Sequence, residues 1–411
     1  MFGVTDMLEK AGHEVIPFSV RYSRNRPTPW SEYFVEPIAG DDEVYFRDHS
    51  FSFRALSRGL QRAFYAPDVY AAVSRLAADC RPDVALVQHY LRKLSPSLLV
   101  ALRDAGVPIV VRLSDFAMVC PGAHLLRAGQ VCRLCITKGF ASAIRHRCVQ
   151  GSLGVSAVTC ASMWYARRRH YFDLIDTFIA PSAIMRTEMI AGGFAAERIV
   201  VLPTFVDAGL FDAGAVRERR IVYVGHIVPG KGVDVLLEAF ARLTHHDDLG
   251  DIELHIAGDG DDPDYVARLS ERARQISPNI RFLGEQTADD VRRLLSSALF
   301  SVVPSIWYEN LPNAMLESLA AGTPVAASDV GSMCDVLEGS AAGFLFTPGD
   351  AADLADRLAD ALSRPEELKR MSVAARRLAE TRYAPATHLT SLIDVLEKAR
   401  ARGATASRAT R

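Results

Sequence analysis

No segment of this 411-residue sequence is apolar for long enough to cross a membrane. A membrane-spanning helix needs about 20 consecutive apolar residues, and Arg103 and Arg112 interrupt the most apolar stretch. The first residues also lack the apolar core of a secretory signal, because Asp6, Glu9 and Lys10 stand where that core would lie. We therefore expect a cytoplasmic protein, for which any membrane contact is peripheral and at the inner membrane face.

A strong net charge is absent as well, since the formal charge is -2. With 49% hydrophobic and 23% charged residues, the composition is that of an ordinary folded protein. Nothing in this balance calls for a nucleic acid as partner, because proteins that bind nucleic acids carry concentrated positive charge. The length exceeds that of one compact core and predicts two domains.

Short runs rich in β-branched residues alternate with helical patterns along both halves of the chain, which predicts parallel sheets covered by helices. The predicted fold class is therefore α/β, with two Rossmann-like, doubly wound domains. The expected strands are 83–87, 107–113, 177–180, 221–224, 254–257, 280–283, 300–303 and 324–327. The expected domains are 1–203 and 204–385, followed by a segment 386–411 in which a helix packs back on the first domain before a frayed tail, 403–411.

The chain does not open on a strand, as α/β domains usually do. Residues 1–11 predict an amphipathic helix that stops at Gly12, and residues 13–20 predict a strand. We therefore expect that a first strand and the loop after it are missing from this sequence, through a misplaced start codon or a real truncation.

The first candidate for a phosphate site is neither a Walker loop nor a G-x-G-x-x-G fingerprint. It is the strand 221–224 with a Gly-rich turn that holds Gly225, His226, Lys231 and Gly232 and opens a helix. Such a turn offers backbone N–H groups and the positive end of a helix dipole, and Lys231 adds a full positive charge, which suits a phosphate. An ordinary loop with a solvated lysine is the alternative, and it stays open at this level.

A second candidate follows the strand expected at 300–303. Asn313 is expected to cap a helix there, with Glu309 in the loop before it and Glu317 about one turn inside it. Two carboxylates beside a helix N-terminus can accept hydrogen bonds from sugar hydroxyls while the N–H groups between them bind a phosphate. The alternative is that Glu317 is a solvated helix residue and that Glu309 only stabilises the helix dipole.

These motifs, with His255-Ile-Ala-Gly258-Asp-Gly260 between them and Ala321-Gly-Thr-Pro324-Val after them, resemble the C-terminal half of the retaining family-4 glycosyltransferases of the GT-B fold. The resemblance covers about residues 220–349. It implies two domains that face a cleft, with a nucleotide-sugar donor held by the C-terminal domain and the acceptor held mainly by the N-terminal domain.

The resemblance also implies roles for single residues. Lys231 would hold the donor diphosphate, Glu309 would contact the transferred sugar, and Glu317 would bind the ribose hydroxyls. The implied catalytic set is Lys231, Glu309 and His226. The implied donor-binding set is Gly225, Gly258, Gly260, Leu283, Gly284, Asn310, Leu311, Asn313 and Glu317.

The implied reaction is transfer of a sugar to a saccharide or lipid-linked acceptor with retention of configuration, in surface polysaccharide or glycoconjugate synthesis. The departing phosphate would accept the acceptor's proton, so neither a side-chain nucleophile nor a divalent metal is required. Three features motivate an alternative: the expected loss of the first strand, His226 where relatives have arginine, and Ser114-Asp115-Phe116 where they have His-Asp and an aromatic residue. The alternative is a catalytically silent GT-B scaffold or nucleotide-binding protein, and a sugar epimerase of this fold is a third hypothesis.

Four of the 7 cysteines lie within one short segment, 120–148. In a cytoplasmic protein a Cys-x2-Cys pair with two outlying cysteines favours metal binding over disulfides. We predict a structural zinc or iron–sulfur site, with unliganded thiols and a redox pair as alternatives. Its ligands would be Cys120, Cys132, Cys135 and Cys148.

Arginines gather near aromatic residues around and after this segment. Arg145, Arg147 and the run 167–169 stand close to Trp164 and Tyr171 in the sequence. A solvated helix face is the favoured interpretation, because a few arginines supply only modest attraction to a membrane. A surface that contacts anionic lipid is the alternative.

Overall fold

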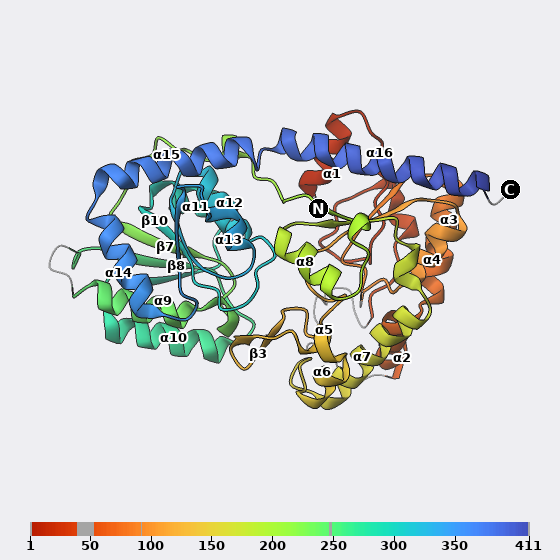
Figure 1. The fold of residues 1–411 in the computed structure, drawn as a ribbon, viewed down its shortest axis with the longest axis horizontal. Coiled ribbons are helices and arrows are strands. Elements are labelled where there is room, and N and C mark those ends of the chain that lie inside the picture. The colour runs from red at the N-terminus through yellow and green to blue at the C-terminus, as the bar shows by residue number, and fades with distance from the viewer. Residues whose placement is uncertain (1, 39–52, 92, 246–248, 410–411) are drawn as a thin grey trace.

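The computed structural model describes residues 2–38, 53–91, 93–245 and 249–409. Figure 1 shows two lobes side by side, each built around a parallel sheet with helices packed about it. The predicted α/β class is therefore confirmed.

The N-terminal lobe contains a four-stranded parallel sheet in the order β1-β2-β5-β6. Its strands are β1 Ala85–Gln88, β2 Ile109–Arg112, β5 Thr177–Ala180 and β6 Ile199–Val201. The helices beside them are α3 Pro67–Cys80, α4 Ser97–Asp104 and α8 Ala183–Ala191. The first three strands lie where the sequence predicts them, whereas β6 is not predicted; two of its three residues are exposed.

The strand expected at 13–20 is wrong. Helix α1 Phe2–Lys10 is present, but the segment after it forms only one isolated bridge, between Val20 and Val35. A strand needs a neighbour that completes its ladder of hydrogen bonds. Among the described residues only this short contact supplies one, in which Arg21 N donates to Val35 O at 2.8 Å.

The cysteine-rich segment forms a small hairpin and two short helices. The hairpin joins β3 Leu126–Arg127 to β4 Gln130–Val131, and α5 Leu134–Lys138 and α6 Ala141–Arg145 follow. Helix α7 Leu153–Arg168 then leads back toward the sheet and packs against α2 Phe53–Phe64. In Figure 1 the hairpin lies on the side of this insertion that faces the C-terminal lobe.

The C-terminal lobe contains a six-stranded parallel sheet in the order β12-β11-β10-β7-β8-β9. Its strands are β7 Arg220–Val224, β8 Glu253–Ala257, β9 Ile280–Gly284, β10 Phe300–Val303, β11 Val325–Ser328 and β12 Gly343–Phe346. Its helices are α9 Val233–Leu243, α10 Pro263–Ile276, α11 Ala288–Ser297, α12 Asn313–Ala320, α13 Ser332–Leu337, α14 Ala351–Leu362 and α15 Pro365–Thr381. The strand order reverses between β7 and β10, and doubly wound sheets bind ligands beyond the carboxyl ends of their strands at such a point.

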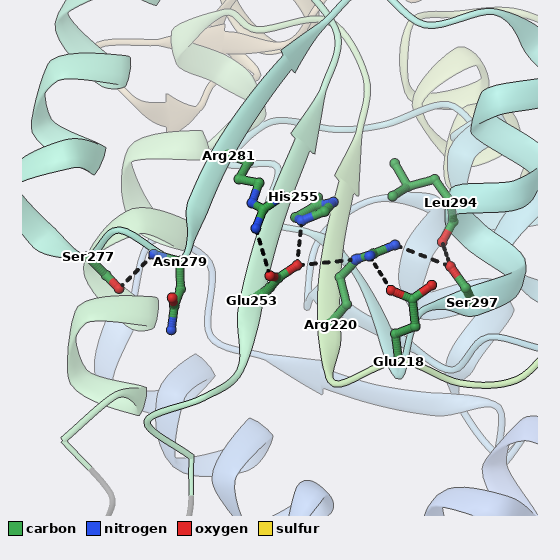
Figure 2. Close-up of polar contacts among 9 residues, drawn as sticks. All are labelled: Glu218, Arg220, Glu253, His255, Ser277, Asn279, Arg281, Leu294 and Ser297. Carbon is green, nitrogen blue, oxygen red and sulfur yellow. Dashed lines mark hydrogen bonds and ion pairs between the residues drawn. The ribbon is translucent and has the colours of Figure 1, made fainter.

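A polar network joins β7, β8 and β9 toward their amino ends, away from that point (Figure 2). Glu253 accepts a hydrogen bond from Arg281 at 3.0 Å, lies 2.8 Å from His255 Nε2, and lies 3.8 Å from Arg220 Nε. His255 is buried, and this burial, followed by the charge of Arg220, lowers the pKa of its imidazole. We assign the network to the stability of the sheet.

Helix α16 Pro385–Ala409 lies along the N-terminal lobe, although it follows the C-terminal lobe in the chain (Figure 1). Its residues Leu392, Val395 and Ala399 pack in one apolar cluster with Val110 of β2. No helix among the described residues is both long enough and apolar enough to span a membrane.

The frayed tail expected over 403–411 is wrong as far as the structure describes it, because α16 is helical through Ala409. A close contact accounts for part of the difference. Gly403 lies so near Pro108 that a Cβ on the glycine would come within 2.5 Å of Pro108 Cγ. Residues 410–411 lie outside the described part of the chain.

The chain crosses between the lobes twice, and the two crossings lie side by side. Val206 N donates to Tyr383 O at 2.9 Å, and His388 Nδ1 is 2.7 Å from Pro203 O. Such a paired connection is where relative movement of two lobes concentrates.

Candidate active site

Glycine-containing loops meet at the carboxyl ends of β7, β8 and β9. Gly258 N donates to Gly284 O at 2.8 Å. A Cβ on Gly258 would lie 1.9 Å from Gly225 O, and a Cβ on Gly260 would lie 2.1 Å from Ile227 O. Only glycine allows backbones to approach so closely. The four glycines predicted to bind the donor therefore lie together at one end of the sheet.

The loop after β7 brings Lys231 to the end of β10. Its single turn of 3-10 helix, Pro229–Lys231, ends at Gly232, whose φ of 69° is left-handed. A Cβ on Gly232 would lie 2.0 Å from the carbonyl oxygen of Pro304. The loop is therefore packed tightly against the end of β10, beside the segment that carries Glu309.

Lys231 and Glu309 form the centre of the site. Lys231 Nζ donates to Glu309 Oε1 at 2.6 Å, and the two side chains are 23% and 11% exposed. The same oxygen accepts from Ser305 Oγ at 2.6 Å and from Trp307 Nε1 at 2.8 Å. Three donors fix this carboxylate, and the lysine brings a positive charge to the place where the strand order reverses.

Three residues around this centre escape the sequence analysis: Ser305, Trp307 and Tyr223. Ser305 and Trp307 stand four and two residues before Glu309, so the alternation along this loop is a signal that could have identified them. Tyr223 donates to the carbonyl oxygen of His226 at 2.8 Å. Burial is the main cause that raises the pKa of Tyr223, and the negative charge of Glu309 adds to the effect.

Asn313 is the first residue of α12 and not its cap, so that expectation is wrong. The capping position belongs to Pro312, whose side chain accepts no hydrogen bond from the helix. The N–H groups at a helix start need partners from outside the helix. The N-terminus of α12 is therefore suited to an anionic ligand.

Glu317, one turn into α12, differs from Glu309 in its surroundings. Burial raises the pKa of Glu317, and the positive charge of Arg292 opposes that rise. Among the residues that the structure describes, no side chain donates a hydrogen bond to the Glu317 carboxylate. A carboxylate in this state can accept hydrogen bonds from the hydroxyl groups of a ligand.

The other predicted residues lie around the centre without joining it. His226 Nε2 is 3.3 Å from Asp261 Oδ2, so its contact is with the loop after β8. Asn310 Nδ2 donates to the carbonyl oxygen of Leu113 at 3.3 Å and thereby links the two lobes. Two residues pack partly buried against the core of the C-terminal lobe: Leu283 and Leu311.

The four cysteines of the insertion do not form the predicted metal site. Within the described ranges, no group of three or more ligand side chains is arranged to hold an ion. A tetrahedral thiolate site needs all four sulfurs about 2.3 Å from one point. The interaction of the Cys135 thiol with Cys120 lowers the pKa of Cys120 and raises that of Cys135. Burial is the main cause that raises the pKa of Cys148.

Residues 212–378 match the family model described as glycosyl transferases group 1. Residues 212–378, which form most of the C-terminal lobe, therefore resemble this family. The matched region contains the central pair, Lys231 and Glu309, and both glycine-rich loops before it. The resemblance carried by the sequence motifs is thus confirmed at the level of the family.

Curated relatives of the chain include two mycobacterial enzymes. An MMP alpha-(1->4)-mannosyltransferase of Mycolicibacterium hassiacum is 33% identical over 214 residues, which cover 50% of each chain. A phosphatidyl-myo-inositol mannosyltransferase of Mycobacterium leprae is 35% identical over 166 residues, 40% of this chain and 42% of the relative. The aligned parts thus span about half the length of these relatives or less.

Solved structures confirm the GT-B fold of the chain. A sucrose-phosphate synthase from Thermosynechococcus elongatus has a TM-score of 0.68 at 17% identity, over 97% of this chain and 92% of that one. Anabaena HepE in complex with UDP has a TM-score of 0.62 at 21% identity, over 81% and 82% of the two chains. The first of these matches extends across both lobes.

Proposed function

We propose that this chain is a glycosyltransferase that transfers a sugar from a nucleotide-diphosphate sugar to a saccharide or lipid-linked acceptor, with retention of configuration. One observation carries the proposal: Lys231 and Glu309 are in contact where the strand order of the C-terminal sheet reverses. Ligands of doubly wound sheets bind at that place. The structures of Anabaena HepE with UDP and with UDP-glucose support a nucleotide sugar as the donor.

The chemistry of the leaving group fits these residues. Departure of a nucleoside diphosphate builds negative charge on phosphate oxygens, and a fixed cation with helix N–H groups stabilises such charge. Lys231 supplies the cation, and the uncapped start of α12 supplies N–H groups. Glu309 remains held by Ser305 and Trp307 when Lys231 turns to the phosphate.

Retention follows in this proposal from attack on the same face from which the diphosphate leaves. The departing phosphate oxygen accepts the proton of the acceptor hydroxyl, so the C–O bond to the phosphate breaks as the bond to the acceptor forms. Glu309 hydrogen bonds a hydroxyl of the transferred sugar and is not a nucleophile. The role in surface polysaccharide or glycoconjugate synthesis is part of the same proposal.

A lipid-linked acceptor is supported by one surface of the N-terminal lobe. Helices α2 and α7 pack together and expose Leu56, Leu60, Leu153 and Trp164, of which Trp164 is 60% exposed. The Arg168 guanidinium lies 5.6 Å from the centroid of the Trp164 ring. Apolar and cationic side chains on neighbouring helices fit an anionic lipid surface. The name of the phosphatidyl-myo-inositol mannosyltransferase points to the same kind of acceptor.

Calorimetry with UDP, GDP and ADP tests the donor site. We expect one of them to bind and Lys231→Ala to weaken that binding at least about tenfold, as the loss of a charged hydrogen bond predicts. Lys398→Ala, on the exposed side of α16, is the matched control. Unchanged affinity in Lys231→Ala would remove this lysine from the site.

Turnover of the matching nucleotide sugar separates the remaining hypotheses. Transfer to an acceptor, with the anomeric configuration read by NMR, supports the enzyme. Tight nucleotide binding without transfer to saccharide or lipid-linked acceptors supports the silent scaffold. Conversion of the nucleotide sugar without any acceptor supports the epimerase.

A further inference from the structure

The indole ring of Trp307 is held from two sides. It lies against the β7 loop, where a Cβ on Gly230 would come within 2.2 Å of Trp307 Cε3. The ring of His124, from the cysteine-rich insertion, stacks on it with centroids 4.5 Å apart and 14° between the planes. Trp307 therefore has little freedom to turn, although it stands on a loop.

This restrained ring is also bonded to the centre of the site. Its Nε1 donates to Glu309 Oε1, the oxygen that Lys231 contacts. A lysine side chain is flexible, whereas an indole N–H moves only with its ring. When a phosphate attracts Lys231, the indole is the more rigid of the donors that keep the carboxylate in place.

The backbone of the cysteine-rich insertion determines where His124 lies. It stands between two buried residues, Ala123 and Leu125, whose φ values of 67° and 50° are left-handed. Ala123 N donates to the carbonyl oxygen of Cys120 at 2.8 Å, and Phe116 N donates to that of Ala123 at 3.1 Å. The chain therefore makes a tight turn after Cys120, and His124 is the residue that this turn presents to the other lobe.

The loop that carries Trp307 and Glu309 makes further contacts with the N-terminal lobe. The ring of Tyr308 lies 6.1 Å from that of Phe116, and Asn310 donates to the carbonyl oxygen of Leu113. Residues immediately before and after Glu309 are thus in contact with the lobe assigned to the acceptor. An effect of the insertion on the site can pass through these few contacts.

We propose that Trp307 is a positioning residue for Glu309, and that the cysteine-rich insertion acts on sugar transfer through His124, which holds Trp307. This inference rests on the proposed function. It adds a role for the insertion that needs no metal ion, and it makes the geometry of Glu309 depend on both lobes.

Four variants of the full-length chain test the inference. Trp307→Phe keeps an aromatic ring but removes the N–H, and we expect kcat for transfer to fall about 10- to 100-fold, the value of one hydrogen bond to a charged group. The KM for the donor and the affinity for the nucleoside diphosphate should stay within about twofold. His124→Ala should lower kcat about three- to tenfold, as the loss of one aromatic contact predicts, whereas His124→Phe should restore it. His146→Ala, an exposed histidine of the same insertion, is the matched control.

A double-mutant cycle separates positioning from a merely structural contact. In a Glu309→Gln background, Trp307→Phe and His124→Ala should cause little further loss of kcat, because the carboxylate that they position is gone. Full additivity of the losses would overturn the inference, and so would wild-type kcat in Trp307→Phe. Absence of transfer already in the wild-type protein would refute the proposed function itself, and this inference with it.

Discussion

Replacing Glu317 by glutamine should stabilise the ligand-free protein and weaken its binding of the nucleotide. The Glu317 carboxylate is partly buried, its pKa is raised, and no side chain in the described part of the protein donates to it. A fully buried polar group without a partner costs roughly 1 to 3 kcal/mol, and Glu317 is only partly buried. We expect Glu317→Gln to gain about 1 kcal/mol in the free energy of unfolding, the lower end of that range, because the carboxylate keeps some contact with water and the amide stays polar. The melting temperature should rise by roughly 2 to 4 °C.

The raised pKa of Glu317 also predicts how the stability gained in Glu317→Gln depends on pH. The folded-state pKa of Glu317 lies above the ordinary value of 4.5, so the folded protein binds this proton more tightly than the unfolded chain does. At neutral pH the carboxylate is charged in both states and only the folded state pays for its burial. As the pH falls through the raised pKa that cost disappears, and below about 4.5 both states are protonated. The advantage of Glu317→Gln should therefore be present at pH 7 and absent at pH 4.

Binding of the nucleoside diphosphate should move in the opposite direction. If the Glu317 carboxylate accepts two ribose hydroxyl groups, an amide offers one acceptor and one mismatched donor. The loss of a charged hydrogen bond weakens affinity about 10- to 100-fold.

Differential scanning calorimetry over pH 4 to 8 and titration calorimetry with the nucleotide measure the two effects. Glu397→Gln, on the exposed side of α16, is the matched control and should change neither. A lower melting temperature for Glu317→Gln at pH 7, or wild-type nucleotide affinity, would refute the reasoning.

Three further changes test the fold by chemical denaturation. Gly232→Ala should lower the free energy of unfolding by more than about 2 kcal/mol, because a left-handed φ is combined with a Cβ 2.0 Å from Pro304 O. Its control, Gly129→Ala, has a φ of 75° and open space around it and should cost only about 1 kcal/mol. Equal losses of stability in the two variants would refute the steric argument. Leu392→Ala, in the cluster beneath α16, should cost roughly 2 to 5 kcal/mol, whereas Val373→Ala, which is 71% exposed, should cost nearly nothing; a neutral Leu392→Ala would show that α16 does not hold the N-terminal lobe. Burial lowers the pKa of His255 below its ordinary 6.5, so the unfolded chain takes up a proton first as the pH falls through 6.5 and stability declines. His255→Asn should make that decline shallower below pH 6.5, and an unchanged slope would contradict the assignment.

Sequence patterns predict the central strands of the C-terminal sheet most directly. Strands β10 and β11 are buried at every position, and a central parallel strand of this kind reads as an apolar run. Residues 13–20 carry a similar local pattern, yet they form no strand. Pairing depends on a neighbour elsewhere in the chain, and the pattern of a segment does not contain that information.

The candidate active site also has one part that the sequence predicts and one part that it does not. The loops of Lys231 and Glu309 are predictable because glycine, lysine and carboxylate residues follow strands at fixed spacing. The stack of His124 on Trp307 joins two lobes and has no counterpart in local spacing. The cysteine spacing favours a metal site, but spacing does not record how the four side chains lie in the fold, and among the described residues no three ligand side chains are arranged to hold an ion.

The position of α16 has a consequence for the order in which the protein folds. Val110 and Ile179 of the N-terminal sheet share an apolar cluster with Leu392 and Val395 of α16. A ribosome releases both strands long before it releases that helix, and domains tend to fold as they emerge. The C-terminal lobe, synthesised in between, is therefore the first to be completed. Until α16 arrives, the uncovered face of the N-terminal sheet is the surface that a nascent-chain chaperone meets.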